Sequence, residues 1–426
     1  MLNYIKEKLQ EMHCDAYEIT EKKVTGWEFY FIRHKLDQNR VKEETTITVS
    51  VYRSLEDGKF LGKATGEIFP TASREEVDKT LEDLYYQASL IKNPYYTLTD
   101  RPLPETEKIA QVDVDKIAED FVTLMKEIPE TEEKYLNSYE IFVNLVEQYM
   151  VNSNGVEYRC TYPQSMLEYV VNARNGEHEI ELYRIGDSGS CDKEGLKKEI
   201  MRTMDFGADR LKAVPTPKME SIPVLLSTDV ATLVYSYLGA QCNVGLKYMK
   251  VSEWEIGKPI SEDLRGDKLS IEVLRSLPNS SKNFDVDSEG SYIQERYLIR
   301  DGVVESYNGA RQFSQYLGIE DNSIIYNAKV SGGTHSAEEL RSGDYLEVVE
   351  FSDFSVDEMG GDIAGEIRLG YLHKDGVTTI VTGGSVAGNM EDALKDMAVS
   401  REMVQYDCYL IPAVTCLKNM RITGVV

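Results

Sequence analysis

IPVLLSTDVATLVYSYLGAQCNVG, residues 222–245, is the stretch that decides how this chain folds and what chemistry it offers. The apolar run Ile222 to Leu226 predicts a short buried strand. Ser227 is expected to cap a helix over residues 228–243. A strand that leads into such a helix is where a zinc hydrolase could place two histidines and a glutamate.

The side chains of this helix are poorly suited to hold zinc. Its middle and end offer Tyr235, Ser236, Ala240 and Gln241. Cys242 alone would bind zinc well, and a single ligand does not make a site. The sequence therefore predicts a helix without a metal, in a place where a metal would fit.

Composition excludes several classes of partner. The 426 residues include 47 Lys and Arg against 73 Asp and Glu, a formal net charge of −26. This charge disfavours binding to nucleic-acid phosphates and to anionic membrane surfaces. No apolar run is long enough to span a membrane, and the N-terminal residues form an amphipathic helix rather than a signal peptide. Six scattered cysteines without a CxxC pair suit reduced thiols, so we expect a cytoplasmic protein.

The N-terminal half is predicted to alternate helices and strands. Ser73 and Glu76 have the spacing of a capping box at the start of a helix over residues 73–92. The polar segment Thr97–Ile109, with two prolines, predicts a surface excursion. Strands are expected at 16–20, 27–33, 45–53, 59–69, 136–151, 156–162, 166–173 and 177–185, and further helices at 4–12, 112–128 and 192–212.

The best linker in the chain is the run from Ala213 to Ser221, because its two prolines cannot continue the preceding helix. We therefore expect two domains, residues 1–214 and 220–426. The first is predicted as an α/β domain with helices on a mixed sheet. The second, rich in short strands and glycine turns, is predicted as a strand-rich mixed domain, and the fold class as α+β.

Other chemical candidates are weaker than the 222–245 stretch. No two histidines are four residues apart on a predicted helix, so no HExxH pair exists. The acidic residues Asp285, Asp287 and Glu289 could attract a cation, but a solvated turn is the better interpretation. Cys408 follows Tyr406-Asp407 and could act as a nucleophile, although no base can be named for it.

Short motifs after residue 220 recur in a specific order. They are Pro223–Ser227, Phe284–Gly290, Tyr297–Val303, Ala310-Arg311, Glu339–Leu346, Gly360–Asp362, Gly370–Leu372, Gly383-Gly384, Gly388-Asn389 and Met420–Gly424. In this order they resemble the TldD/PmbA family of peptide-maturation proteins, also named modulators of DNA gyrase. The resemblance is strong after residue 220 and looser before it.

The resemblance implies two kinds of member. The TldD kind is a metalloprotease with HExxxH on the helix after PVxLS, and the TldE/PmbA kind lacks the motif and is its partner subunit. Aligning Gly239 with the family glycine places the two histidines at Tyr235 and Ala240 and the glutamate at Ser236. The family's FDSEG is also lengthened here, because Val286 and Asp287 are inserted.

The resemblance therefore implies a noncatalytic subunit that holds no cofactor and pairs with a zinc-bearing TldD-like chain acting on unfolded peptides. Phe284, Glu289, Arg311 and Cys408 are its candidate cleft residues. Two alternatives stay open. One is a stand-alone homodimer that binds peptides without cutting them. The other is an active peptidase whose site the motifs do not reveal, with Cys408 as a possible nucleophile.

Overall fold

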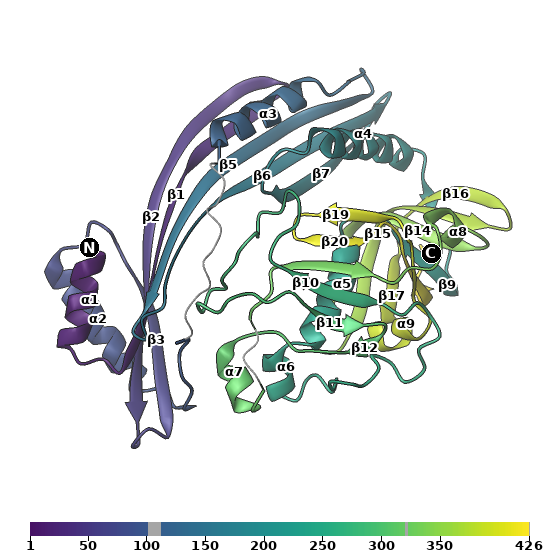
Figure 1. Ribbon diagram of the computed structural model, residues 1–426. Helices are drawn as coiled ribbons and strands as arrows, with labels where there is room; N and C mark the ends of the chain where they lie inside the picture. The colour runs from purple at the N-terminus through teal and green to yellow at the C-terminus, as the bar shows by residue number, and fades with distance from the viewer. Residues whose placement is uncertain (101–111, 320–322, 426) are drawn as a thin grey trace.

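The computed structural model describes residues 1–100, 112–319 and 323–425. Its strands form one seven-stranded sheet in the N-terminal half and two sheets, of six and eight strands, in the C-terminal half. Figure 1 shows the long N-terminal strands as one curved ribbon, with α1 and α2 at one end and α3 and α4 at the other. The predicted α+β class is confirmed.

The N-terminal sheet has the order β4-β3-β2-β1-β5-β6-β7. Its strands are β1 (Ala16–Ile32), β2 (Lys35–Leu55), β3 (Phe60–Ile68), β4 (Asn93–Pro94), β5 (Lys134–Asn152), β6 (Glu157–Asn175) and β7 (His178–Ser188). All of its strand pairs are antiparallel, so the expected mixed sheet is wrong in this detail. Two pairs of predicted strands are each one long strand, β1 and β6, because their polar middles pair with neighbours throughout.

Four helices cover parts of this sheet: α1 (Leu2–Glu11), α2 (Arg74–Ala88), α3 (Val114–Lys126) and α4 (Lys193–Arg210). The predicted capping box starts α2, since the Ser73 hydroxyl and the Glu76 side chain each bond the other's backbone N–H. Helices α1 and α2 share a core with residues of β1, β2, β3 and β5. Helices α3 and α4 share a second core with residues of β1, β5, β6 and β7 and with Val349 and Leu369 of the C-terminal half.

The eight-stranded sheet contains a closed ring of five strands. Hydrogen bonding runs from β14 (Tyr345–Val356) through β9 (Met219–Leu226), β21 (Thr415–Ile422), β17 (Ser385–Asn389) and β15 (Asp362–Lys374) back to β14. The pairs β9–β14 and β8–β16 are parallel and the others antiparallel, so this sheet is mixed, and the predicted strand-rich character of the C-terminal half is confirmed. Attached to the ring are β16 (Val377–Thr382), β8 (Val214–Pro215) and β18 (Ala398–Val399).

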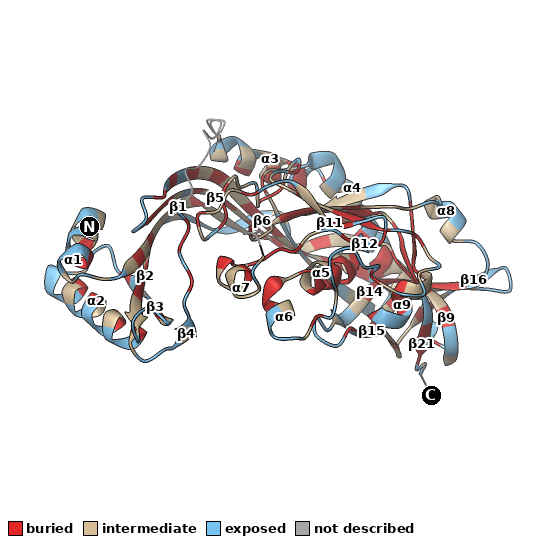
Figure 2. Ribbon diagram, turned by 60° about the horizontal axis from the view of Figure 1, so that its bottom comes forward, coloured by how far each residue is buried: buried red, intermediate tan, exposed pale blue. Residues whose placement is uncertain are grey.

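The six-stranded sheet has the order β12-β11-β10-β13-β20-β19. Its strands are β12 (Val303–Val304), β11 (Arg296–Arg300), β10 (Ser270–Leu274), β13 (Asn327–Ser331), β20 (Tyr409–Pro412) and β19 (Met403–Tyr406). The helices of this half are α5 (Ala231–Gln241), α6 (Val244–Tyr248), α7 (Arg311–Tyr316), α8 (Ala337–Leu340) and α9 (Met390–Asp396). Side chains of α5 lie in one core with residues of both C-terminal sheets, and Figure 2 shows buried residues along most of this helix.

The predicted surface excursion at residues 97–109 is wrong for its first residues, and residues 101–111 lie outside the described part of the chain. Leu98 and Thr99 are buried, and the Asn152 side chain donates to the Thr99 carbonyl at 2.7 Å. The Thr97 carbonyl accepts from the Arg311 guanidinium at 2.7 Å. This stretch therefore ties the N-terminal sheet to helix α7.

The predicted linker forms short strands instead of a free connection. Val214 and Pro215 pair with β16, and β9 begins at Met219. The division into domains of residues 1–214 and 220–426 stays a prediction. No helix within the described residues has the length and apolarity needed to cross a membrane.

An ion pair between Arg184 of β7 and Glu350 of β14 also joins the two halves. The Arg184 NH1 group donates to Oε2 of Glu350 at 3.0 Å, and its NH2 group contacts Oε1. The exposed fractions of the two side chains are 17% and 6%. A carboxylate as deeply buried as that of Glu350 needs this cation.

We expect Arg184→Ala to lower the free energy of unfolding by about 3–5 kcal/mol, because it leaves the Glu350 carboxylate buried without a cation. The matched control is Arg300→Ala, which breaks the exposed pair with Glu305 and is expected to cost less than about 1 kcal/mol. Urea unfolding followed by circular dichroism measures both. Equal losses for the two variants would contradict the structural role of Arg184.

Candidate functional site

Helix α5 has a core side and a partly open side. Val234, Tyr235 and Leu238 are buried, whereas Leu233 is exposed and Ser236 is partly exposed. The helix begins at Ala231 and has Val230 at its N-cap position, so the predicted cap by Ser227 is wrong. The Ser227 hydroxyl instead donates to Oε1 of Glu347 at 2.6 Å.

The three positions that would carry HExxxH do not face one common point. The Tyr235 side chain is 1% exposed, and its hydroxyl lies 2.6 Å from that of Thr415. Ser236 points the other way and donates to the exposed Glu358 at 3.3 Å, beside the Tyr409 phenol. Ala240 is partly exposed on the same side as Ser236.

These residues do not fit a zinc ion. Burial raises the pKa of the Tyr235 phenol, so the phenolate that would bind zinc is disfavoured. Ser236 is a poor ligand and Ala240 offers no donor atom. Among the described residues, no three His, Cys, Asp or Glu side chains are grouped closely enough to hold a metal ion.

The loop from Phe284 to Gly290 lies between the two halves and brings three predicted cleft residues to one region. The Glu289 carboxylate accepts a hydrogen bond from the backbone N–H of Arg311 at 2.8 Å. The Phe284 ring meets Tyr162 of β6 and Tyr326 edge to face, with ring centroids 4.8 and 4.9 Å apart. Phe284, Glu289 and Arg311 are thus packed into the junction between the halves.

The two inserted residues have structural roles that the sequence did not reveal. Val286 is buried against Tyr158, Cys160 and Tyr162 of β6. The Asp287 carboxylate accepts backbone N–H groups of Glu289, Ser291 and Ile324 at 2.8–2.9 Å. Asp287 is 3% exposed, so the prediction of a solvated turn is wrong at this residue. The only sequence signal was an aspartate before a Ser-Glu-Gly turn, which is common on surfaces.

Burial raises the pKa of Glu289 to about 7, and the neighbouring Asp287 and Glu18 carboxylates act in the same direction. The hydrogen bond from the Arg311 N–H acts against them. Between about pH 4.5 and 7, native Glu289 keeps a proton that the unfolded chain has lost. Its contribution to the free energy of unfolding is therefore largest at low pH and falls as the pH rises through this window.

We expect Glu289→Gln to raise the free energy of unfolding at pH 8 relative to the wild type, by at most about 3 kcal/mol, because the amide needs no proton. At pH 5 the two proteins should differ much less. The glutamine oxygen can still accept the Arg311 N–H. Urea unfolding at both pH values measures the difference, and the exposed Glu338→Gln serves as the control. A difference that does not change with pH would contradict the assignment.

Cys408 lies in the turn between β19 and β20, next to Asp407, whose carboxylate accepts hydrogen bonds from Ser281. Burial, followed by the adjacent Asp407 carboxylate, raises the pKa of its thiol to about 11. Only the thiolate is a nucleophile. The surroundings of Cys408 therefore suppress the reactivity that the active-peptidase alternative would need.

At pH 7.5 we expect iodoacetamide to alkylate native Cys408 more than about 100-fold more slowly than the same residue in the urea-unfolded chain. Mass spectrometry of the Cys408 peptide measures the two rates. In any preparation with proteolytic activity, Cys408→Ala should leave that activity unchanged. Native alkylation as fast as in urea, or loss of activity in the variant, would favour Cys408 as a nucleophile.

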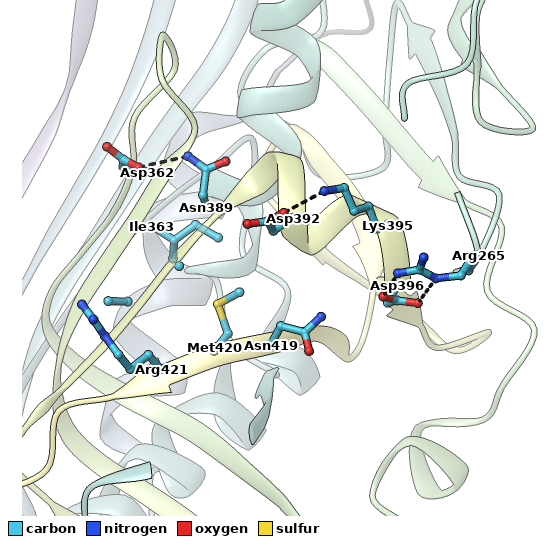
Figure 3. Close-up of a pocket in the computed structure, with 12 residues that line it drawn as sticks. Arg265, Asp362, Ile363, Asn389, Asp392, Lys395, Asp396, Asn419, Met420 and Arg421 are labelled. Carbon is cyan, nitrogen blue, oxygen red and sulfur yellow. Dashed lines mark hydrogen bonds and ion pairs between the residues drawn. The ribbon is translucent and has the colours of Figure 1, made fainter. Parts of the chain in front are cut away.

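A surface pocket of about 760 Å³ lies beside α9, where β17 and β21 separate (Figure 3). The two strands pair only at Val386 and Ala387, and Asn419 adopts a left-handed φ of 62° where the β21 register is irregular. Most of the charged lining residues are paired. These pairs are Arg265–Asp396, Lys395–Asp392 and Asn389–Asp362. None of the residues predicted for the site lines this pocket.

A smaller pocket of about 300 Å³ lies between α4 and the C-terminal end of β9. Glu347 and Arg341 form two hydrogen bonds of 2.6 and 2.8 Å at its wall, and Ser227 completes this group. The pocket is lined by Arg202, Phe206, Ser227, Ala337, Arg341, Glu347, Val349, Tyr371, Ala413 and Val414. The sequence missed this group because Ser227 lies more than 100 residues before Arg341 and Glu347.

Comparison with known proteins identifies the C-terminal half. Residues 219–424 match the family model described as the PmbA/TldA metallopeptidase C-terminal domain. No curated protein sequence matches the chain.

Three solved structures share the fold over nearly the whole chain. TldE from Thermococcus kodakarensis is 17% identical, with a TM-score of 0.79 and 100% of both chains covered. A protein from Thermotoga maritima that is named as a modulator of a DNA gyrase is 14% identical, with a TM-score of 0.77 and 99% and 100% covered. A protein from Bacteroides thetaiotaomicron with a similar name is 16% identical, with a TM-score of 0.73 and 99% and 98% covered. At these identities the likeness shows the fold alone.

Proposed function

This chain belongs, through its C-terminal domain, to the TldD/PmbA family, and we propose that it is the noncatalytic, TldE/PmbA-like subunit of a zinc metalloprotease. Its partner would be a TldD-like chain that carries HExxxH and the zinc. The substrate class would be unfolded peptides, cleaved during peptide maturation. The proposal places the pair in the cytoplasm, where thiols such as the six free cysteines of this chain stay reduced.

The observation that carries the proposal is the state of the three HExxxH positions on α5. Tyr235 is turned into the core and bonded to Thr415, Ser236 is directed at Glu358, and Ala240 has no donor atom. The fold around the motif is nevertheless complete. A chain with the whole scaffold but unsuitable ligands fits a subunit that supports a partner's site.

Co-expression with a TldD-like chain tests the proposal. We expect the two chains to co-purify and to give proteolysis of an unfolded peptide that needs zinc and that neither chain shows alone. Changing the glutamate of the partner's own HExxxH should abolish it. By contrast, Ser236→Ala in this chain should leave the rate unchanged, because the Ser236 hydroxyl is not expected to touch substrate.

Metal analysis of this chain purified alone is a second test of the proposal. The proposal requires far less than one zinc per chain, and one equivalent of bound zinc would overturn it. A stable homodimer that ignores every TldD-like partner, measured by light scattering, would instead favour the peptide-binding homodimer.

A further inference from the structure

Within the described residues, one face of the N-terminal sheet is not covered by a helix. Helices α3 and α4 pack on the opposite face, against side chains such as Ile141, Leu167 and Leu182. Because side chains alternate along a strand, the intervening residues point away from these helices. We call this surface the helix-free face and define it by Tyr30, Glu140, Phe142, Glu168, Tyr183 and Ile185, which the strand register places side by side.

Two carboxylates lie directly opposite each other on the helix-free face. Glu140 of β5 is the register partner of Glu168 of β6, and both side chains are partly buried. Like charges in this arrangement repel. Burial, followed by the charge of Glu168, raises the pKa of Glu140, and the positive charge of Arg40 acts in the opposite direction. Among the described residues, neither carboxylate forms an ion pair with a lysine or arginine, and Glu168 accepts a hydrogen bond only from the Tyr183 hydroxyl, at 2.9 Å.

Aromatic and aliphatic side chains surround the two carboxylates. Tyr30 and Phe142 meet edge to face, with ring centroids 5.8 Å apart. Tyr183 and Ile185 on β7 are 53% and 50% exposed. A surface of this kind can take up the apolar stem of a long cationic side chain while its charged end reaches a carboxylate.

Further along the strands, the same face already holds a polypeptide. Val24, Val146 and Tyr162 point to this side, and the C-terminal loop packs on them through Phe284 and Val286. The contact shows that the face can pack against an irregular segment of chain. The part around Glu140 and Glu168 continues this surface along β5 and β6.

We propose that the helix-free face binds an extended polypeptide segment through its lysine or arginine side chains. A cation between Glu140 and Glu168 would relieve their repulsion, and the rings would pack on its stem. The net charge of −26 would favour the approach of such segments. The inference rests on the proposed function only in taking the ligand to be a polypeptide, and it adds a preference for basic side chains.

Fluorescence anisotropy with the isolated chain tests this preference. The probes are two labelled ten-residue peptides in which hydrophobic residues alternate with lysine in one and with glutamate in the other. We expect the lysine peptide to bind at least tenfold more tightly, with an affinity that falls as salt rises. The double variant Glu140→Gln/Glu168→Gln should weaken binding of the lysine peptide at least tenfold.

The matched control is Glu147→Gln/Glu177→Gln, which removes the same charge from two exposed side chains off the helix-free face. It should change the affinity less than twofold. Thermal unfolding checks the fold, and the double variant at Glu140 and Glu168 should be no less stable than the wild type because it removes a repulsion. Equal binding of the two peptides, or equal losses in both double variants, would overturn the inference.

This result is independent of the partner test. Tight binding of the lysine peptide that Glu140→Gln/Glu168→Gln weakens would support the inference even if no TldD-like chain co-purified. Conversely, zinc-dependent proteolysis by the pair with no effect of this variant on peptide binding would support the proposed function and overturn the inference.

Discussion

The burial of α5 between the two C-terminal sheets is the constraint on which the rest of that half depends. The helix is apolar on nearly every side, so it is stable only when surrounded, and residues of both sheets share its core. Fully burying side chains such as Val234 and Leu238 contributes about 1.5–3 kcal/mol each. With those two positions fixed inward, Tyr235 is also held in the core, where its hydroxyl meets Thr415. The chemistry offered at this position therefore follows from packing.

The two halves of the molecule are held together by contacts that demand one geometry. The core around α3 and α4 includes Val349 and Leu369, so apolar burial joins the halves. The Arg184–Glu350 pair and the hydrogen bond from the Arg311 guanidinium to the Thr97 carbonyl add direction to this contact, since each works only in one arrangement. These contacts therefore hold the N-terminal sheet in one position relative to the C-terminal half. Binding surfaces on the sheet are thus placed relative to α5.

The sequence predicted features that depend on neighbours along the chain. The capping box of Ser73 and Glu76 needs residues three apart, and it forms as predicted. Strand lengths were not predictable in this way. Glu21–Gly26 looked like a break in β1, but pairing on both sides carries the strand through, with the Gly26 backbone close to Val143.

In the candidate site, too, some features could be predicted from the sequence and others could not. The losses at Tyr235, Ser236 and Ala240 follow from the residue types alone, as does the unsuitability of alanine for zinc. The role of Ser227 could not be predicted, because its partner Glu347 lies 120 residues further on. Asp287 looked like a surface acid because its backbone donors come partly from Ile324 in another segment. The roles of both residues depend on partners that are distant in the sequence, and the sequence alone does not show which residues meet in the fold.

On the proposed function, this chain would contribute to catalysis only through its surfaces, so surface features that lower its stability point to possible binding sites. Opposed carboxylates such as Glu140 and Glu168 lower the stability of an antiparallel pair. The long β5–β6 pairing tolerates this cost, because many neighbouring residue pairs hold the two strands in register. A bound cation would be attracted by both carboxylates, and among the described residues neither carboxylate forms an ion pair that the cation would have to displace. On the proposed binding of a basic segment, this repulsion would be relieved when the segment binds.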